Sequence, residues 1–163
     1  MKIRKAVLPD SKEICDIYNY YINNTIVTFE KQSISVNEMN NRVSSVKQQH
    51  PWLVCELNKK VIDYAYANPW RTREAYKNTV ESAVYIHPEF ISKGVDTLLY
   101  RELINQLQKT NIHAIIGGIS LPNKASIALH EKFGFEKVAH FKEVGFKFNK
   151  WIDVGYWELL FNN

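Results

Sequence analysis

The chain has 163 residues, 45% hydrophobic and 13% aromatic, which excludes a disordered chain and suits one domain, residues 1–163, with a sizeable core. Its net charge of +4, from 21 basic and 17 acidic residues with the lysines scattered, favours a small anionic ligand over nucleic acid. No apolar run reaches about 18 residues, and Cys15 and Cys55 lie far apart, without metal-ligand or redox spacing. We therefore expect a cytoplasmic protein with reduced thiols, no membrane association and no metal.

The first thirty residues predict a strand, a helix and a short extended segment. Residues 1–8 form a tentative strand that ends at a proline. Asp10 and Glu13 have the spacing of a capping box and open a helix. The apolar positions of that helix are Ile14, Ile17, Tyr18, Tyr21 and Ile22. Residues 25–30 then read as extended chain.

A second helix and a hairpin follow. Ser35 and Glu38 form a clearer capping box, which opens a helix through about Gln49. Residues 52–57 and 61–67 are two apolar runs separated by Asn-Lys-Lys, and we expect them to pair as strands.

Residues 79–96 are the stretch around which the rest of the chain is organised. Alternating residues predict a strand that ends at His87-Pro88, because proline cannot donate to a ladder. A glycine-containing loop, residues 92–94, leads into a helix over residues 95–109. A strand, a turn and a helix in this order present free backbone N–H groups at a helix N-terminus, which suits a phosphate.

The last third continues the alternation of strands and helices. Residues 113–119 predict a buried strand, and Asn123 caps a helix that ends at Gly134. Two final strands over residues 135–144 and 150–161 complete the chain, joined by residues 145–149. The order predicts a mixed α/β fold in which helices cover both faces of one mixed sheet.

Three segments carry a resemblance to a known family: AYKNTVES, LPNKASIALHEKFGF and VGFKFNKWIDVGYW. Over residues 3–160 the chain resembles the GNAT acyltransferases, and within them the phosphinothricin N-acetyltransferase-like branch. The resemblance implies a GNAT fold, with a central, mostly antiparallel sheet flanked by helices and two central strands that splay apart to admit acetyl-CoA. It also implies an N-acetyltransferase that acetylates a small amino-acid-like amine of the phosphinothricin or methionine sulfoximine type.

Two residues are candidates for acid–base chemistry. Glu81, in the TVES segment, would draw the proton from the amine; without the resemblance it reads instead as a solvent-facing strand residue or an ion-pair partner. His130, in the LHEK segment, holds a position where many GNAT proteins have a tyrosine. It would protonate the departing thiolate or assist deprotonation, or it is a structural hydrogen-bonding residue.

The substrate pocket that the resemblance implies consists of Phe29, Arg73, Tyr76, Tyr85 and Val154, with Glu81. Phe29 is otherwise a core residue, and Arg73 lies in a polar loop that is either simply solvated or lends its guanidinium to an acidic substrate group. The family often forms homodimers, so Val154 is expected from the neighbouring subunit.

The implied cofactor contacts are Val84, Ile86, Lys93, Gly94, Val95, Asp96, Asn123 and Ser126. Within the pyrophosphate loop this chain departs from the family pattern, with Ile91 at the usual polar position and Asp96 at the usual small one. Two like charges about 4 Å apart repel by roughly 4 kcal/mol at an effective dielectric near 20, so Asp96 predicts weakened acetyl-CoA binding. A non-catalytic ligand binder with an impaired cofactor loop is the alternative function.

Overall fold

The computed structural model describes residues 1–91 and 93–162 and contains one seven-stranded sheet in the order β1-β2-β3-β4-β5-β7-β6. The strands are β1 (Lys2–Lys5), β2 (Trp52–Leu57), β3 (Lys60–Pro69), β4 (Thr79–Ile86), β5 (Ala114–Ser120), β6 (Glu136–Lys147) and β7 (Lys150–Leu160). The helices are α1 (Ser11–Asn24), α2 (Val36–Lys47), α3 (Val95–Gln108) and α4 (Lys124–Lys132). Short 3₁₀ helices cover Leu8–Asp10, Glu74–Tyr76 and Pro88–Phe90. Only β4 and β5 pair in parallel, which confirms the mixed, mostly antiparallel sheet.

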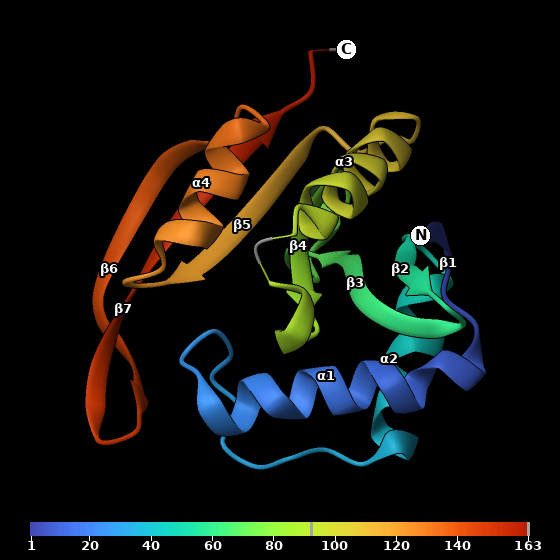
Figure 1. The fold of residues 1–163 in the computed structure, drawn as a ribbon. Helices are drawn as coiled ribbons and strands as arrows, with labels where there is room; N and C mark the ends of the chain where they lie inside the picture. The colour runs from blue at the N-terminus through green and yellow to red at the C-terminus, as the bar shows by residue number, and fades with distance from the viewer. Residues whose placement is uncertain (92, 163) are drawn as a thin grey trace.

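Helices cover both faces of the sheet, and each face has its own apolar core (Figure 1). α1 and α2 pack on one face, where Ile14, Met39 and Tyr64 are buried. α3 and α4 pack on the other face, where Leu99 and Trp157 are buried. The alternation of side chains along β4 supplies both cores, because successive residues of a strand point to opposite faces.

The central strands part after a short paired stretch. β4 and β5 pair at Thr79, Val80 and Glu81 and then diverge, as Figure 1 shows. The N–H of His87 donates to the Ile62 carbonyl of β3, so hydrogen-bonded and non-hydrogen-bonded pairs alternate back along β4. The backbone groups of Val84 and Ile86 belong to the non-hydrogen-bonded pairs and therefore point away from β3, into the gap.

Most predicted element ends agree with the structure to within a few residues. Ser35 caps α2 by accepting from the Glu38 N–H at 3.1 Å, and Asn123 caps α4 by accepting from the Ser126 N–H at 3.1 Å. Gly134 ends α4 with a φ of +85°, the left-handed conformation that glycine adopts freely. Within the described residues, no helix is long and apolar enough to cross a membrane.

Three local predictions were wrong. Asp10 does not cap α1 with its side chain, because its carboxylate binds Arg4 in two hydrogen bonds and accepts the Val7 N–H. Residues 25–30 were expected to be extended, but residues 26–28 form bends. β6 continues to Lys147, so the connection to β7 is the two-residue turn Phe148-Asn149, where both residues have left-handed φ values of 51° and 57°.

Candidate active site

The gap between β4 and β5 holds a pocket of about 220 Å³, hereafter the cofactor-side pocket. Its lining comprises Tyr21, Val27, Val84, Ile86, Ile91, Asp96, Asn123, Ala125, Ser126 and Leu129. Five of the eight predicted cofactor residues are in this set. They come from β4, the start of α3 and the start of α4, three segments that are distant in sequence and that the parting of the strands brings together.

The N-terminus of α3 borders this pocket. Gly94 precedes the helix with a φ of +74°, and Lys93 and Gly94 are exposed, whereas the Val95 side chain is buried in the core and can offer only its backbone. Asp96 lies in the first turn, and its Oδ1 accepts the Thr97 N–H at 2.8 Å. One of the backbone donors that an anion would use is therefore already satisfied by a carboxylate.

Asp63 lies next to this pocket, although nothing in the sequence pattern singled it out. It pairs across β3 and β4 with Ile86, which lines the pocket. Asp63 is fully buried, and within the described structure neither of its carboxylate oxygens has a partner in hydrogen-bonding geometry. Burial and the charge of Asp96 raise the pKa of Asp63 well above its ordinary value, against a smaller lowering by the Tyr64 N–H.

A second pocket of about 170 Å³, hereafter the Glu81 pocket, lies on the face that carries α1 and α2. Val27, Phe29, Glu81, Gly118, Ser120, Val154 and Tyr156 line it. The structure therefore brings together Glu81, Phe29 and Val154 of the predicted set within one chain. Val154 of the same chain lines this pocket, because the β5–β7 pairing places it opposite Ser120. A contribution from the Val154 of a neighbouring subunit stays a prediction.

Glu81 occupies the last paired position of β4, where the strands part. Its carboxylate lies over Gly118, where a Cβ would come within 2.9 Å of Oε1 and 3.2 Å of the Tyr156 ring. The absence of a side chain at Gly118 therefore lets the Glu81 carboxylate and the Tyr156 ring lie close to the β5 backbone. Burial raises the pKa of Glu81, which moves it towards the range of a useful general base. Burial, and secondarily the charge of Glu81, also raises the pKa of Tyr156.

His130 lies on the opposite face of β5. The side chain is 5% exposed, and Nδ1 lies 2.7 Å from the Ser126 carbonyl oxygen, so the neutral ring donates from Nδ1 and leaves Nε2 free of a proton. Burial lowers the pKa of His130 and favours this neutral form. A Cβ on Gly117 would collide with Nε2, whereas a Cβ on the next residue, Gly118, would meet Glu81. The sheet thus separates His130 from Glu81.

The remaining predicted substrate residues lie elsewhere. Arg73 and Tyr76 are exposed in the loop between β3 and β4 and line a separate pocket with Arg71 and Thr72. Tyr85 was expected in the substrate pocket, but it is buried against Tyr18, Tyr21 and Tyr64, with ring centroids 5.2–5.3 Å apart. The alternation along β4 turns Tyr85 into the core beneath α1.

Sequence reasoning missed Val27, Gly118, Ser120 and Tyr156. A signal was available for Gly118, because two consecutive glycines inside the otherwise apolar β5 indicate a close approach of other groups to the strand. Tyr156 follows from it, since it is the cross-strand partner of Gly118. Among the residues described, no group of three or more His, Cys, Asp or Glu side chains is arranged to hold a metal ion.

Comparison with known proteins agrees with this geometry. The family model for an acetyltransferase (GNAT) domain matches residues 3–155. A phosphinothricin N-acetyltransferase of Streptomyces viridochromogenes is 34% identical over 97% of this chain and 86% of its own length. An L-methionine sulfoximine/L-methionine sulfone acetyltransferase of Salmonella typhimurium is 32% identical over 98% of this chain and 94% of its own.

Similar solved structures include complexes with acetyl-CoA. A GNAT superfamily phosphinothricin acetyltransferase from Sinorhizobium meliloti in complex with AcCoA superposes with a TM-score of 0.95 at 32% identity, covering 99% of this chain and 88% of that one. The matched domain spans most of the chain, and the relatives agree over nearly its whole length. This chain belongs to the GNAT acetyltransferase family.

Proposed function

We propose that this protein is an acetyl-CoA-dependent N-acetyltransferase that acetylates the amine of a small amino-acid-like acid, of the phosphinothricin or methionine sulfoximine type. The observation that carries the proposal is the pair of adjoining pockets at the point where β4 and β5 part, one suited to the cofactor and the other containing Glu81. The substrates named for the relatives supply the substrate class.

Each group of the chain has a defined task in this proposal. Acetyl-CoA supplies an activated acetyl thioester when it is bound. The backbone N–H groups of Val84 and Ile86, which point into the gap, would hold the cofactor, together with Asn123 and Ser126 from the start of α4. Glu81 takes the proton that the amine loses as its nitrogen attacks. The attack is direct, without a covalent enzyme intermediate.

Substrate recognition involves the loop before β4. Arg73 offers an exposed guanidinium for the acidic group of the substrate, with Tyr76 beside it. Trp70, at the start of this loop, contacts Tyr156 of the Glu81 pocket edge to face, with ring centroids 5.5 Å apart. This contact supports the proposal that the loop carrying Arg73 and the Glu81 pocket bind the same substrate.

The alternative of a non-catalytic ligand binder receives no support from the relatives, which are named as acetyltransferases. Weakened cofactor binding through Asp96 remains a separate prediction. We also propose a homodimer, on the grounds of the exposed apolar hairpin treated below. Cytoplasmic location and the lack of nucleic-acid, membrane and metal partners stay predictions from the sequence.

Acetyl transfer by the purified protein tests the proposal. We expect release of free thiol from acetyl-CoA in the presence of phosphinothricin or methionine sulfoximine. Glu81→Gln should lower kcat/KM by about 10²–10⁴-fold, the usual contribution of a general base. Burial raises the pKa of Glu81, so wild-type activity should increase with pH as Glu81 loses its proton. The midpoint of this increase should lie above the pKa of an ordinary glutamate, about 4.3.

Glu136→Gln, on the exposed start of β6, is the matched control and should leave kcat/KM unchanged. A Glu81→Gln protein with full turnover and an unaltered pH profile would remove Glu81 from the mechanism.

A further inference from the structure

The cofactor-side pocket and the Glu81 pocket share a wall. Among the described lining residues of the two, Val27 alone occurs in both sets. Its side chain is half-buried and packs against the apolar core beneath α1. A thioester held in the first pocket and an amine held in the second would therefore meet beside Val27.

The backbone on both sides of Val27 is fixed. The N–H of Val27 donates to Thr25 Oγ1 at 3.2 Å, and Ser120 Oγ donates to the Ile26 carbonyl. On the other side, the Lys147 ammonium donates to the Thr28 carbonyl at 2.7 Å. Lys147 is itself almost fully buried, so it holds the segment to β6 rather than pointing into solvent.

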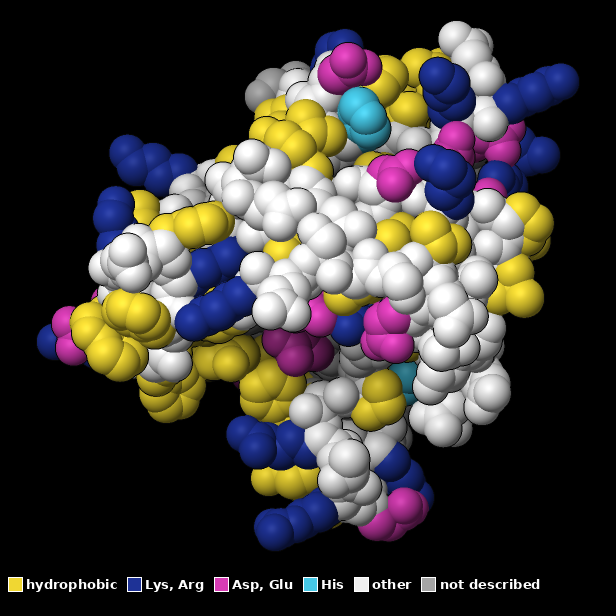
Figure 2. Space-filling view, turned by 90° about the horizontal axis from the view of Figure 1, so that it is seen from below, with side chains coloured by type: hydrophobic (Ala, Val, Ile, Leu, Met, Phe, Trp, Pro, Cys, Tyr) yellow, Lys and Arg dark blue, Asp and Glu magenta, His cyan; other side chains and the backbone are white. Residues whose placement is uncertain are grey.

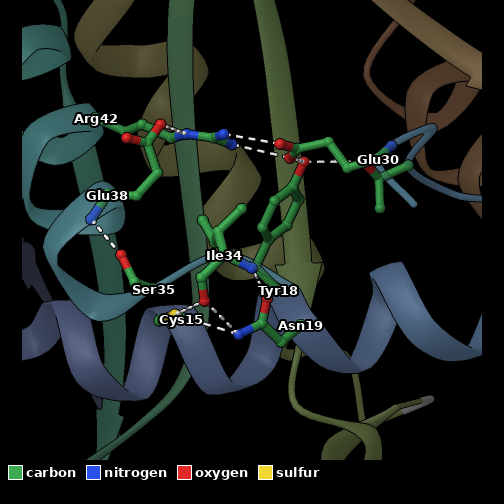
Figure 3. A network of polar contacts seen from close by, with 9 residues as sticks. Cys15, Tyr18, Asn19, Glu30, Ile34, Ser35, Glu38 and Arg42 are labelled. Carbon is green, nitrogen blue, oxygen red and sulfur yellow. Dashed lines mark hydrogen bonds and ion pairs between the residues drawn. The ribbon is translucent and has the colours of Figure 1, made fainter. Parts of the chain in front are cut away.

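A polar network extends this anchoring (Figure 3). The Arg42 guanidinium on α2 binds both carboxylate oxygens of Glu30 at 2.7 and 2.9 Å, and Tyr18 on α1 points at the same carboxylate and at Thr28 Oγ1. Val27 thus lies in a segment that α1, α2, β5 and β6 all hold. Because its segment is held in place, Val27 presents a rigid surface to the two pockets.

We propose that Val27 sets the length of the acyl group that the enzyme transfers, by closing the space beyond the acetyl methyl. The inference rests on the proposed function. In the transfer a nitrogen–carbon bond forms and the carbon–sulfur bond breaks; Glu81 takes the amine proton, and coenzyme A leaves as the thiolate. The reacting atoms must approach to about 3–3.5 Å, so the acyl carbon lies where the pockets meet and its substituent faces the shared wall.

Acyl-chain selectivity in Val27 variants tests this. One methylene in an apolar pocket changes the specificity ratio by about ten- to two-hundredfold. Val27→Ala should raise the propionyl-CoA to acetyl-CoA ratio of kcat/KM by at least about tenfold. Val27→Leu should lower acetyl transfer and weaken calorimetric binding of acetyl-CoA relative to free coenzyme A. Val27→Thr, of the same shape, should keep the wild-type preference for acetyl-CoA.

Val138→Ala is the matched control, because Val138 is exposed on β6 away from both linings, and its ratios should equal those of the wild type. An unchanged propionyl to acetyl ratio in an active Val27→Ala protein, or unchanged relative binding of acetyl-CoA and coenzyme A by Val27→Leu, would overturn the inference. Failure of the proposed function can be distinguished from failure of the Val27 inference, because the wild-type protein would then transfer no acetyl group at all. The calorimetric comparison would still test Val27 in that case.

Discussion

At the scale of single residues, Asp63 is a fully buried carboxylate without a partner for its charge in the described structure. Its neighbours across the strands are Cys55 on β2 and Ile86 on β4, neither of which offers a charge of opposite sign. The carboxylate of Asp96, at the start of the helix packed above, adds repulsion. Both facts favour the protonated acid, because a neutral carboxyl group is far less costly to bury than an unpaired charge.

The pH dependence of stability should expose this group. The pKa of Asp63 is higher in the folded state than in the unfolded state, where it is about 3.9. Protonated Asp63 therefore contributes its full stability below about pH 3.9, and this contribution is lost as the pH rises through the folded-state pKa. Asp63→Asn removes the titration and keeps the shape. Between pH 5 and pH 8 the wild type should therefore lose unfolding free energy relative to Asp63→Asn, measured by urea denaturation.

Asp16→Asn serves as the control, because Asp16 is exposed and pairs with Lys12 on the surface of α1. Parallel pH profiles for the wild type and Asp63→Asn would mean that Asp63 titrates normally.

Residue identity predicted the site only in part. Glu81 was found because it lies in the TVES segment that carries the resemblance, and the structure places it at the point where β4 and β5 part. Tyr85 shares the Glu81 face of β4, as alternation predicts, but it lies farther along the strand, where it is buried against Tyr18 and Tyr64. Sequence alone did not show which positions of that face α1 covers. Tyr156 and Val27 required the β5–β7 register and the path of the 25–30 segment, which depend on contacts between residues distant in sequence.

At the scale of elements, the N-terminus of α3 combines a helix dipole suited to an anion with a carboxylate that competes for it. Asp96 lines the cofactor-side pocket and already uses the Thr97 N–H. Both the charge and the occupied donor oppose a pyrophosphate at this place.

Replacing Asp96 should therefore tighten acetyl-CoA binding. We expect Asp96→Gly to lower the dissociation constant by more than about tenfold in a calorimetric titration, since half of a repulsion of roughly 4 kcal/mol exceeds the 1.4 kcal/mol that corresponds to tenfold. Asp96→Asn separates the two effects, because its side-chain oxygen can still accept from Thr97 while the charge is gone. It should fall between the wild type and Asp96→Gly. Equal affinity in all three proteins would contradict this role of Asp96.

The ends of helices were predictable from the sequence where one residue type caps the helix. The end of a strand was not predictable where the turn that follows lacks the glycine typical of such turns. Ser35, Asn123 and Gly134 behave as their types suggest. The turn after β6 places left-handed conformations on Phe148 and Asn149, without a glycine, so its position was not evident from the sequence. The long pairing of β6 with β7 stabilises that turn against its local cost.

At the scale of the whole molecule, the β6–β7 hairpin projects beyond the helices (Figure 1), and apolar side chains gather near its end (Figure 2). Val144, Phe146, Phe148 and Trp151 are all more than 40% exposed, and the Phe146 and Trp151 rings lie 4.8 Å apart. β6 is also an edge strand of the sheet. An exposed apolar surface at a strand edge is a common site of association, which supports a second copy of this chain as its partner.

Removing the aromatic rings from this end should separate the subunits. We expect the double change Phe148→Ser and Trp151→Ser to convert a dimer into a monomer in light scattering at micromolar concentration, because the exposed rings would supply the central apolar contact. Since the described residues that line the cofactor-side pocket all belong to one chain, the monomer should still bind acetyl-CoA with wild-type affinity. Val36→Ser, an exposed valine at the start of α2, should leave the dimer intact. A wild-type protein that is already monomeric would refute the dimer, and loss of acetyl-CoA binding on separation would show that the partner completes the cofactor site.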